Sequence, residues 1–453
     1  MLLSAIIVFA TLLGVYLSLL KPSSFLSFYL FYAIPVAGGF MYTYGRATMG
    51  EMTLGVSVGP FNVDVYVPIL IATSVGIFWH IYANQRGNRL HKAAAIFVFV
   101  MLLVGAFKIV DSYLQGYSVV SILGDFSRKY NLYFVALWCL VALPLDTKEL
   151  LVSLRNGVFY MAVAGIIFSI MSLLWFGGED VSGVTKRFGT AESALALLLG
   201  GIGMLLLWEG KERRIWHSVL GGICLVMVLL ADHRSVWLAG VVCVIAYSAF
   251  NMLGMWGRST IVVRVLIPVL GVLAVMLLFA LVSTDMADSV LGREQGEVLR
   301  VRAKAIVAPE EDGTAKWRME RWDWVIERVH SENKGWVGFD IGEYSKMSDA
   351  EIGITVVAHN GYVDQYSRYG LVGCILYAGF LFVCVRNVLA QIMHGNLDTL
   401  SLAYLRCILM VMVAGHAYAL AYGFVGTITV FMCLGALFTT TPVQNTVLQR
   451  KRA

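Results

Sequence analysis

Apolar runs close to 20 residues long recur along most of this sequence and constrain its fold more than any other feature. A helix of about 20 apolar residues crosses the roughly 30 Å hydrocarbon core of a bilayer. Only 14% of the residues are charged, whereas soluble domains carry about a quarter. We therefore expect an all-α, polytopic transmembrane helix bundle of about 12 to 13 spans. The runs lie at residues 2–20, 25–42, 63–83, 93–111, 131–146, 157–177, 190–208, 217–231, 236–254, 265–283, 371–391, 403–421 and 425–441.

Basic residues in certain short loops orient this bundle, because positively charged loops stay in the cytoplasm. An even number of spans separates each pair of these loops, which predicts that the N-terminus and residues 284–358 lie outside. The first run has no basic segment before it and no cleavage site after it, so we expect a retained helix. The half-apolar segment 112–130 is a candidate interfacial or re-entrant piece. The orienting residues are Arg86, Arg89 and Lys92; Lys211, Arg213 and Arg214; Arg258 and Arg264; and Arg450, Lys451 and Arg452.

The runs divide the chain into three parts: N-terminal transmembrane helices (1–283), a periplasmic loop subdomain with short helices (284–358), and C-terminal transmembrane helices with a basic cytoplasmic tail (359–453). All seven cysteines fall inside apolar runs, so neither a disulfide framework nor a zinc cluster is indicated. The outer carboxylates lack a compact calcium-loop pattern. We expect no metal, no cofactor and no nucleic-acid partner.

The predicted outer face is unusually basic. Arg234 interrupts two apolar runs by only a few residues, and an ionisable residue so close to hydrocarbon suggests a functional site. The alternative is an arginine that reaches the interface and pairs with Asp232. The outer basic residues are Lys186, Arg187, Arg234, Arg293, Arg300, Arg302, Lys304, Arg318, Arg321, Arg328 and Arg368.

Two further groups on this face suit anion binding. Arg187 precedes an apolar run at the expected N-terminus of a helix, where free backbone N–H groups attract anions; the alternative is an ordinary loop capped by Thr190. Arg318, Arg321 and Trp322 belong to a cluster in which a helix would separate a basic stripe from an apolar one at the outer interface. Arginine can bond two oxygens of a diphosphate at once. The alternative is an interfacial helix without a catalytic role.

His359 is the best titratable candidate for catalysis. It lies where the outer loop meets the next apolar run, and its usual pKa of about 6.5 suits proton transfer. Asn360 follows it, and Gly370 and Gly373 have the spacing that allows close backbone packing in membrane bundles.

His-Asn followed nine residues later by Gly-x-x-Gly resembles the signature of the O-antigen ligase and polymerase superfamily. Three other stretches resemble the same family in the same order: KRFGTAESALA (186–196), HRSVWLAG (233–240) and WRMERWDWVIERVHSENKGWVGFDIGEY (317–344). The sequence departs from the family at Gly338 and Gly342, where a tighter glycine pair usually follows a proline, and at His233, where serine is more usual.

The resemblance implies transfer of an undecaprenyl-diphosphate-linked oligosaccharide to an acceptor hydroxyl on the periplasmic side of the bacterial inner membrane, without a metal. It assigns His359 as the base or as a diphosphate ligand. It assigns Arg187, Arg234, Arg318 and Arg321 to the diphosphate, with Asn360, Gly370, Gly373 and Trp322 in support. The acceptor is another glycan or lipid A-core, and the partners it implies are membrane lipids, a chain-length regulator and export proteins.

Three functions remain open at this stage. A polymerase that joins repeat units of an O-antigen, capsule or exopolysaccharide is slightly favoured, because each polysaccharide pathway needs its own polymerase. An O-antigen ligase differs only in its acceptor pocket. A lipid-linked sugar flippase would place charges near the bilayer midplane, whereas here the charges gather on one face.

Overall fold

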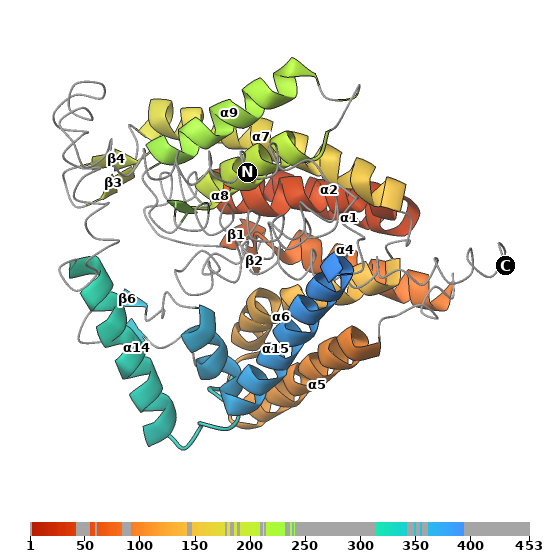
Figure 1. Cartoon of the computed structure of the whole chain (residues 1–453). Coiled ribbons are helices and arrows are strands. Elements are labelled where there is room, and N and C mark those ends of the chain that lie inside the picture. Colours follow the sequence, from red (N-terminus) through yellow and green to blue (C-terminus); the bar gives the residue numbers. More distant parts are fainter. Residues whose placement is uncertain are drawn as a thin grey trace.

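The computed structural model is a bundle of α-helices (Figure 1). It describes residues 2–41, 55–58, 61–83, 92–142, 147–176, 179–181, 185–187, 191–208, 212, 214–231, 236–237, 240, 313–341, 348–349, 354–355 and 361–393. The helices are α1 (Leu2–Leu20), α2 (Pro22–Phe31), the π-helix η1 (Tyr32–Met41), α4 (Val67–Tyr82), α5 (Lys92–Leu114), α6 (Val119–Ala142), α7 (Thr147–Phe176), α8 (Ala191–Leu206), α9 (Ile215–Leu230), α14 (Gly313–Ser331) and α15 (Gly361–Met393).

The predicted all-α membrane bundle is confirmed. Four described helical segments are long and apolar enough to cross a bilayer: Leu2–Leu20, Pro22–Met41, Ala95–Leu114 and Leu151–Ser172. Shorter apolar helices accompany them. The predicted spans 265–283, 403–421 and 425–441, and nearly all of 236–254, lie outside the described residues.

The described residues include three antiparallel two-stranded hairpins, each between two helices. They pair β1 (Gly55–Val58) with β2 (Phe61–Asp64), β3 (Glu179–Val181) with β4 (Thr185–Arg187), and β5 (Ser348–Asp349) with β6 (Ile354–Thr355). The sequence analysis did not predict these hairpins, because strands of two to four residues are too short to carry an alternating pattern.

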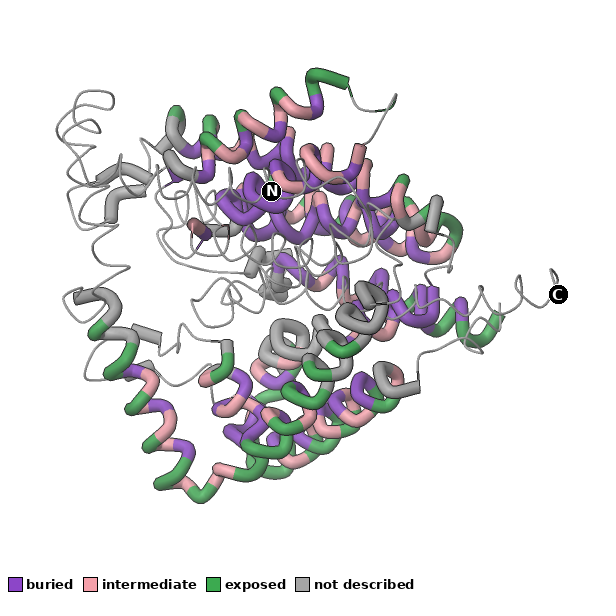
Figure 2. Tube along the Cα trace, in the orientation of Figure 1, coloured by how far each residue is buried: buried purple, intermediate pink, exposed green. Residues whose placement is uncertain are grey.

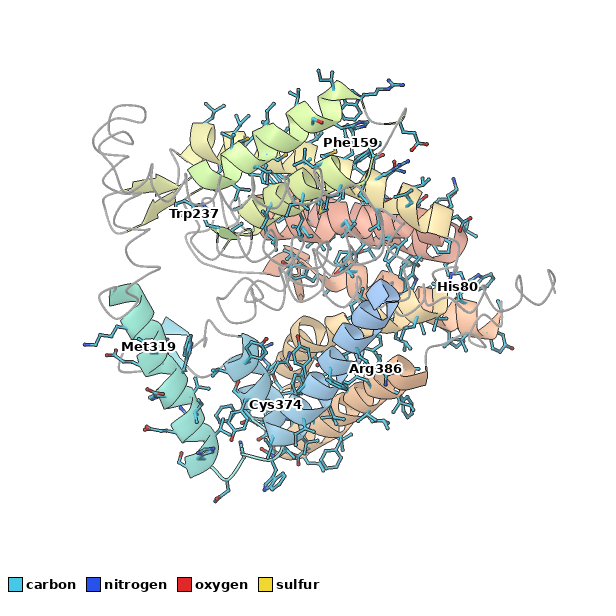
Figure 3. All side chains as sticks on the ribbon, in the orientation of Figure 1. His80, Phe159, Trp237, Met319, Cys374 and Arg386 are labelled. Carbon is cyan, nitrogen blue, oxygen red and sulfur yellow. The ribbon has the colours of Figure 1, made fainter. Side chains whose placement is uncertain are left out.

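Polar contacts join helix ends on the side predicted to be cytoplasmic. The ring nitrogen Nε2 of His80, labelled in Figure 3, lies 2.8 Å from the Ser18 carbonyl oxygen, which joins the ends of α4 and α1. The Ser27 hydroxyl donates to the Ser153 carbonyl at 2.7 Å and joins the first turns of α2 and α7. Arg155 Nε donates to the Leu207 carbonyl at 2.7 Å, beside the predicted cytoplasmic loop 211–214.

The opposite helix ends also meet one another. The Phe40 and Phe168 rings stack with centroids 5.2 Å apart near the ends of η1 and α7. A Cβ on Gly39, in the last turn of η1, would lie 2.7 Å from the Ser193 hydroxyl in the first turn of α8. Helices α1 and α4 therefore run in the same direction, as do α2 and α7, whereas α8 runs opposite to η1. These directions agree with the even number of spans between basic loops.

The turn between α5 and α6 corrects one prediction. Gly116 has φ of 87°, and Tyr117 N–H bonds to the Ser112 carbonyl at 3.1 Å, which is the Schellman pattern that ends a helix. Ser118 then accepts a hydrogen bond from Ser121 N–H through its hydroxyl and caps α6. Segment 112–130 is therefore not a separate re-entrant piece: residues 119–130 are the first turns of α6.

The helices differ in how much of their surface other elements cover. Figure 2 shows α2 and α8 largely buried, whereas α1, α5 and α15 each expose one side. On α5 the exposed side is apolar: Phe99, Leu103 and Phe107 are 61%, 52% and 72% exposed. Such a stripe is typical of a helix that faces lipid.

Gly200 of α8 allows the close approach of α7. A Cβ at this position would lie 2.9 Å from the Ala162 Cα, whereas a Cβ on Gly222 of α9 has no described atom within 4 Å. We expect Gly200→Ala to lower the stability of the purified protein by about 1–3 kcal/mol, because two helix backbones must separate. The matched change Gly222→Ala should be neutral or stabilising by up to about 1 kcal/mol, since alanine is the better helix former. Unfolding in detergent followed by tryptophan fluorescence measures both, and equal effects would contradict this account of the α7–α8 contact.

Candidate functional site

Helix α14 buries one stripe of its surface. Arg321, Val325 and Val329 recur every four positions and are 5%, 0% and 0% exposed, respectively. Met319, labelled in Figure 3, is 39% exposed on another side of the helix. The predicted helix is therefore present, but the predicted separation of basic from apolar residues is wrong for Arg321, which shares the buried stripe with the two valines.

The end of α14 directs the chain toward α15. Asn333 adopts φ of 57°, and Lys334 N–H bonds to the Val329 carbonyl at 2.9 Å while Asn333 N–H bonds to the His330 carbonyl at 3.0 Å. These two bonds form a Schellman motif with asparagine in the left-handed position. The Lys334 ammonium bonds to the Asp340 carboxylate at 2.8 Å and closes the loop that follows.

Helix α15 is broken at Gly370. This glycine has φ of 63° and ψ of −164°, a combination that essentially only glycine adopts. Figure 1 shows the first half, Gly361 to Tyr369, on the side of α14, and the second half beside α5. A helix break leaves carbonyl groups without partners at the end of the first half and N–H groups without partners at the start of the second.

The loop Gly335–Phe339 supplies hydrogen bonds to both sides of the break. Phe339 N–H donates to the Ser367 carbonyl at 2.7 Å, at the end of the first half. Leu371 N–H, at the start of the second half, donates to the Gly335 carbonyl at 2.9 Å. We call this arrangement, the loop 335–339 inserted against the break at Gly370, the loop–helix junction.

Glycines make the loop–helix junction possible. A Cβ on Gly370 would lie 2.2 Å from the Trp336 carbonyl carbon, and one on Gly338 (φ 73°) would lie 2.5 Å from the Arg368 carbonyl carbon. A Cβ on Gly373 would meet the Tyr369 Cβ at a similarly forbidden distance. Among described residues, the close approach expected at Gly-x-x-Gly is thus to the outer loop and to the chain's own Tyr369, not to a second transmembrane helix.

A small apolar cluster holds the first half of α15 against α14. Val325, Val329 and Phe339 form its buried part, with Val363 and Tyr366 of α15 packed on it. The Tyr366 hydroxyl lies 2.8 Å from His330 Nε2. Burial, together with a smaller effect of the Cys374 thiol, raises the pKa of Tyr366, which favours its neutral, hydrogen-bonding form.

Two polar residues of α5 tie the loop–helix junction to the membrane bundle. The Lys108 ammonium donates to the Phe339 carbonyl at 2.8 Å and to the Arg368 carbonyl at 2.6 Å. The Ser112 hydroxyl accepts a hydrogen bond from Ile341 N–H at 3.0 Å. Lys108 and Ser112 are 5% and 0% exposed. The sequence interpretation missed both, although a lysine inside an apolar span was a signal of function or buried pairing.

Some of the predicted site residues lie in the described part of the chain and others do not. Arg187 lies on β4, paired in register with Glu179; Arg318, Arg321 and half-buried Trp322 lie on α14. Arg234, His359 and Asn360 lie outside the described residues. Among the predicted site residues that the structure describes, the loop–helix junction brings Gly370 against the loop at Trp336, whereas Gly373 meets Tyr369 of the same helix. No group of three His, Cys, Asp or Glu residues that could hold a metal occurs in the described part of the chain.

The sequence model of a family described as O-antigen ligase matches residues 219–378 of the chain. The match runs from α9 through α14 and the break in α15, and so includes the whole loop–helix junction. It includes Arg234, Arg318, Arg321 and His359, whereas Arg187 lies before it. The resemblance to the O-antigen ligase and polymerase superfamily is thereby confirmed. A search of curated proteins gave no match.

Replacement of Gly370 separates a steric effect from backbone strain. Gly370→Ala places a methyl group on the Trp336 backbone and forces alanine into a glycine-only conformation, so we expect a loss of about 3 kcal/mol or more. Gly116→Ala is the matched control: its φ is 87°, yet no described atom lies within 4 Å of the added Cβ, and it should lose only about 1–2 kcal/mol. The measurement is the free energy of unfolding of the detergent-purified proteins. Equal losses would mean that the junction is not held by this close contact.

Proposed function

From the match to the O-antigen ligase family over residues 219–378, we propose that this multi-pass membrane protein transfers an undecaprenyl-diphosphate-linked glycan to an acceptor hydroxyl on the periplasmic side of the bacterial inner membrane. In the favoured form, the acceptor is another lipid-linked repeat unit and the product is a longer surface polysaccharide. The matched family indicates glycan transfer in polysaccharide or lipopolysaccharide assembly; the choice of donor and acceptor is part of the proposal.

One structural observation supports a site on the outer face. The loop–helix junction contacts α5 through Lys108 and Ser112, which lie in the last two turns of that helix. The start of α5 follows the basic loop with Arg86 and Arg89, which predicts that its last turns lie outside. Helix α14, with Arg318 and Arg321, and the residues that lead into α15, His359 and Asn360, then belong to the same outer region.

The proposed reaction divides the work between a base and fixed cations. The acceptor hydroxyl oxygen attacks the anomeric carbon of the glycan, and His359 takes the hydroxyl proton. The bond from that carbon to the diphosphate oxygen breaks, and the lipid diphosphate leaves with the electron pair. Arg187, Arg234, Arg318 and Arg321 stabilise the charge that develops on it. No metal is required in this scheme.

The burial of Arg321 suits this role. A cation that is only 5% exposed interacts with an anion through a medium of lower polarisability than water, so the same charge stabilises a leaving group more strongly. Its planar fork also matches two diphosphate oxygens, which a lysine ammonium does not. Arg318 lies almost one turn earlier on α14 and would extend the binding surface toward the start of that helix.

Exchange of the proposed base tests the mechanism. We expect His359→Ala to lower the rate of glycan transfer by about 10²–10⁴-fold, the usual contribution of a general base. His330→Gln is the control, because it removes an exposed imidazole of α14 while the amide can still bond to the Tyr366 hydroxyl, which lies 2.8 Å from His330 Nε2. The measurement is elongation of a lipid-linked oligosaccharide by purified protein. If His359→Ala and Arg234→Ala both leave glycan length and attachment unchanged in cells, the mechanism is wrong.

A deletion strain separates the proposed polymerase from the alternative ligase. A polymerase deletion should leave a single repeat unit attached to lipid A-core and remove long chains. A ligase deletion should remove all attachment while long lipid-linked chains accumulate. Mass spectrometry of lipopolysaccharide and secreted glycan distinguishes the two outcomes.

The alternative of another class is a lipid-linked sugar flippase. A flippase moves its substrate across the membrane unchanged, so the purified protein would yield no longer or transferred product from a lipid-linked oligosaccharide. Product formation by the wild type, lost in His359→Ala, excludes this alternative.

A further inference from the structure

We propose that Lys108 is a positioning residue for glycan transfer: its ammonium fixes the loop–helix junction against α5 and thereby sets the place of the helix that follows His359. The proposal rests on the proposed function, since it names a residue that serves the same site. It goes beyond the signature of the outer face, because Lys108 belongs to a membrane-spanning helix in the N-terminal half of the chain.

The geometry points to Lys108 because its ammonium joins two segments that are far apart in sequence. It donates at 2.8 Å to the Phe339 carbonyl of the loop and at 2.6 Å to the Arg368 carbonyl of α15. The first bond fixes the loop and the second fixes the last turn before the break at Gly370. One cation thus holds both partners of the loop–helix junction on the surface of α5.

A lysine at position 108 of α5 carries a free-energy penalty unless its ammonium group is paired. It lies within the candidate span Ala95–Leu114, roughly two turns from the outer end of that helix. Ionisable side chains inside membrane spans carry a free-energy penalty and almost always pair within the protein. The buried stripe of α5 includes Met101, Lys108 and Ser112, so the lysine points into the protein and away from lipid.

Electrostatics favours a cation at this place. The first half of α15 ends at Tyr369, and the last carbonyl groups of a helix carry a partial negative charge. Phe339 N–H satisfies the Ser367 carbonyl, and Lys108 satisfies that of Arg368. An apolar side chain of the same length would leave the Phe339 and Arg368 carbonyls without this donor, which carries a desolvation penalty for each group.

The functional consequence concerns the start of α15. Only ten residues separate His359 from the break at Gly370, and most of them form one short helix. Because this short helix moves as one unit, a shift of its last turn at Tyr369 also shifts its first turn at Gly361. A displacement of about 1 Å at a catalytic group can lower a rate by 10²-fold. Loss of Lys108 should therefore reduce the chemical rate and leave donor binding by the arginines of α14 largely intact.

The first experiment compares Lys108→Met with Lys21→Met, the same chemical change at an exposed lysine between α1 and α2. Elongation of a lipid-linked oligosaccharide is followed at several donor concentrations. We expect kcat of Lys108→Met to fall about 10- to 100-fold, with KM for the donor within about threefold of wild type, and Lys21→Met to match wild type. A folded Lys108→Met protein with unchanged kcat, or with its loss confined to KM, overturns the proposal.

Ser112→Ala keeps the test decisive if Lys108→Met does not fold. It removes one hydrogen bond from the same contact, that of Ile341 N–H to the hydroxyl, and leaves the lysine in place. A several-fold lower kcat with unchanged KM supports the proposal, whereas wild-type kinetics in this variant contradicts it.

A second measurement does not depend on glycan transfer. Trypsin cuts after Lys334, whose bond to Gly335 lies in the loop at the junction. In wild-type protein in right-side-out vesicles, the hydrogen bonds of the loop should protect this bond. Lys108→Met should make a fragment beginning at Gly335 appear at least about tenfold faster. An equal rate in both proteins contradicts the proposal even if transfer is demonstrated. If wild-type protein transfers no glycan, the proposed function fails, and the cleavage rates still decide whether Lys108 holds the junction.

Discussion

The loop Gly335–Phe339, inserted against the break in α15, is the contact on which the arrangement of α14, α15 and α5 depends. It accepts a hydrogen bond from the second half of the helix and donates one to the first. The left-handed backbone at Gly338 and Gly370 lets the two segments approach until no Cβ would fit between them. Each segment thus completes the hydrogen bonding of the other. Beside this exchange, the small cluster around Phe339 packs the first half of α15 on α14.

A membrane environment explains why a broken helix needs hydrogen-bond partners from the protein. Unsatisfied backbone groups near hydrocarbon cost several kcal/mol each, so an interrupted helix persists only where protein groups replace its missing hydrogen bonds. The break lets α15 change direction at Gly370 without a long linker. Lys108 and Ser112 of α5 also satisfy backbone groups of this region: the Lys108 ammonium donates to the Phe339 carbonyl, and the Ser112 hydroxyl accepts from Ile341 N–H.

Much of the fold was predictable, because lipid imposes a simple rule on helices. The predicted runs 2–20 and 25–42 correspond to Leu2–Leu20 and Pro22–Met41, and the directions of neighbouring helices agree with the basic loops. Helix α7 begins ten residues before its apolar run, at Thr147, because polar first turns can extend into water: Arg155 there pairs with Glu212 at 2.6 Å. The junction was not predictable. Lys108 meets carbonyls 231 and 260 residues away, and Gly370 meets Trp336, pairings that no local pattern encodes.

The lysine of the loop–helix junction and the arginines of α14 differ in the acceptors that their charged groups suit. A lysine ammonium is a compact charge with three donors, which suits separate backbone carbonyls such as those of Phe339 and Arg368. An arginine fork suits paired oxygens of one anion. Lys108 therefore suits the carbonyls that it contacts, whereas the guanidinium groups of Arg318 and Arg321 on α14 suit the diphosphate that we propose as their ligand. Replacement of Lys108 by arginine, or of Arg318 or Arg321 by lysine, would keep the positive charge. It would lose the match between the geometry of the donor group and the geometry of the acceptors.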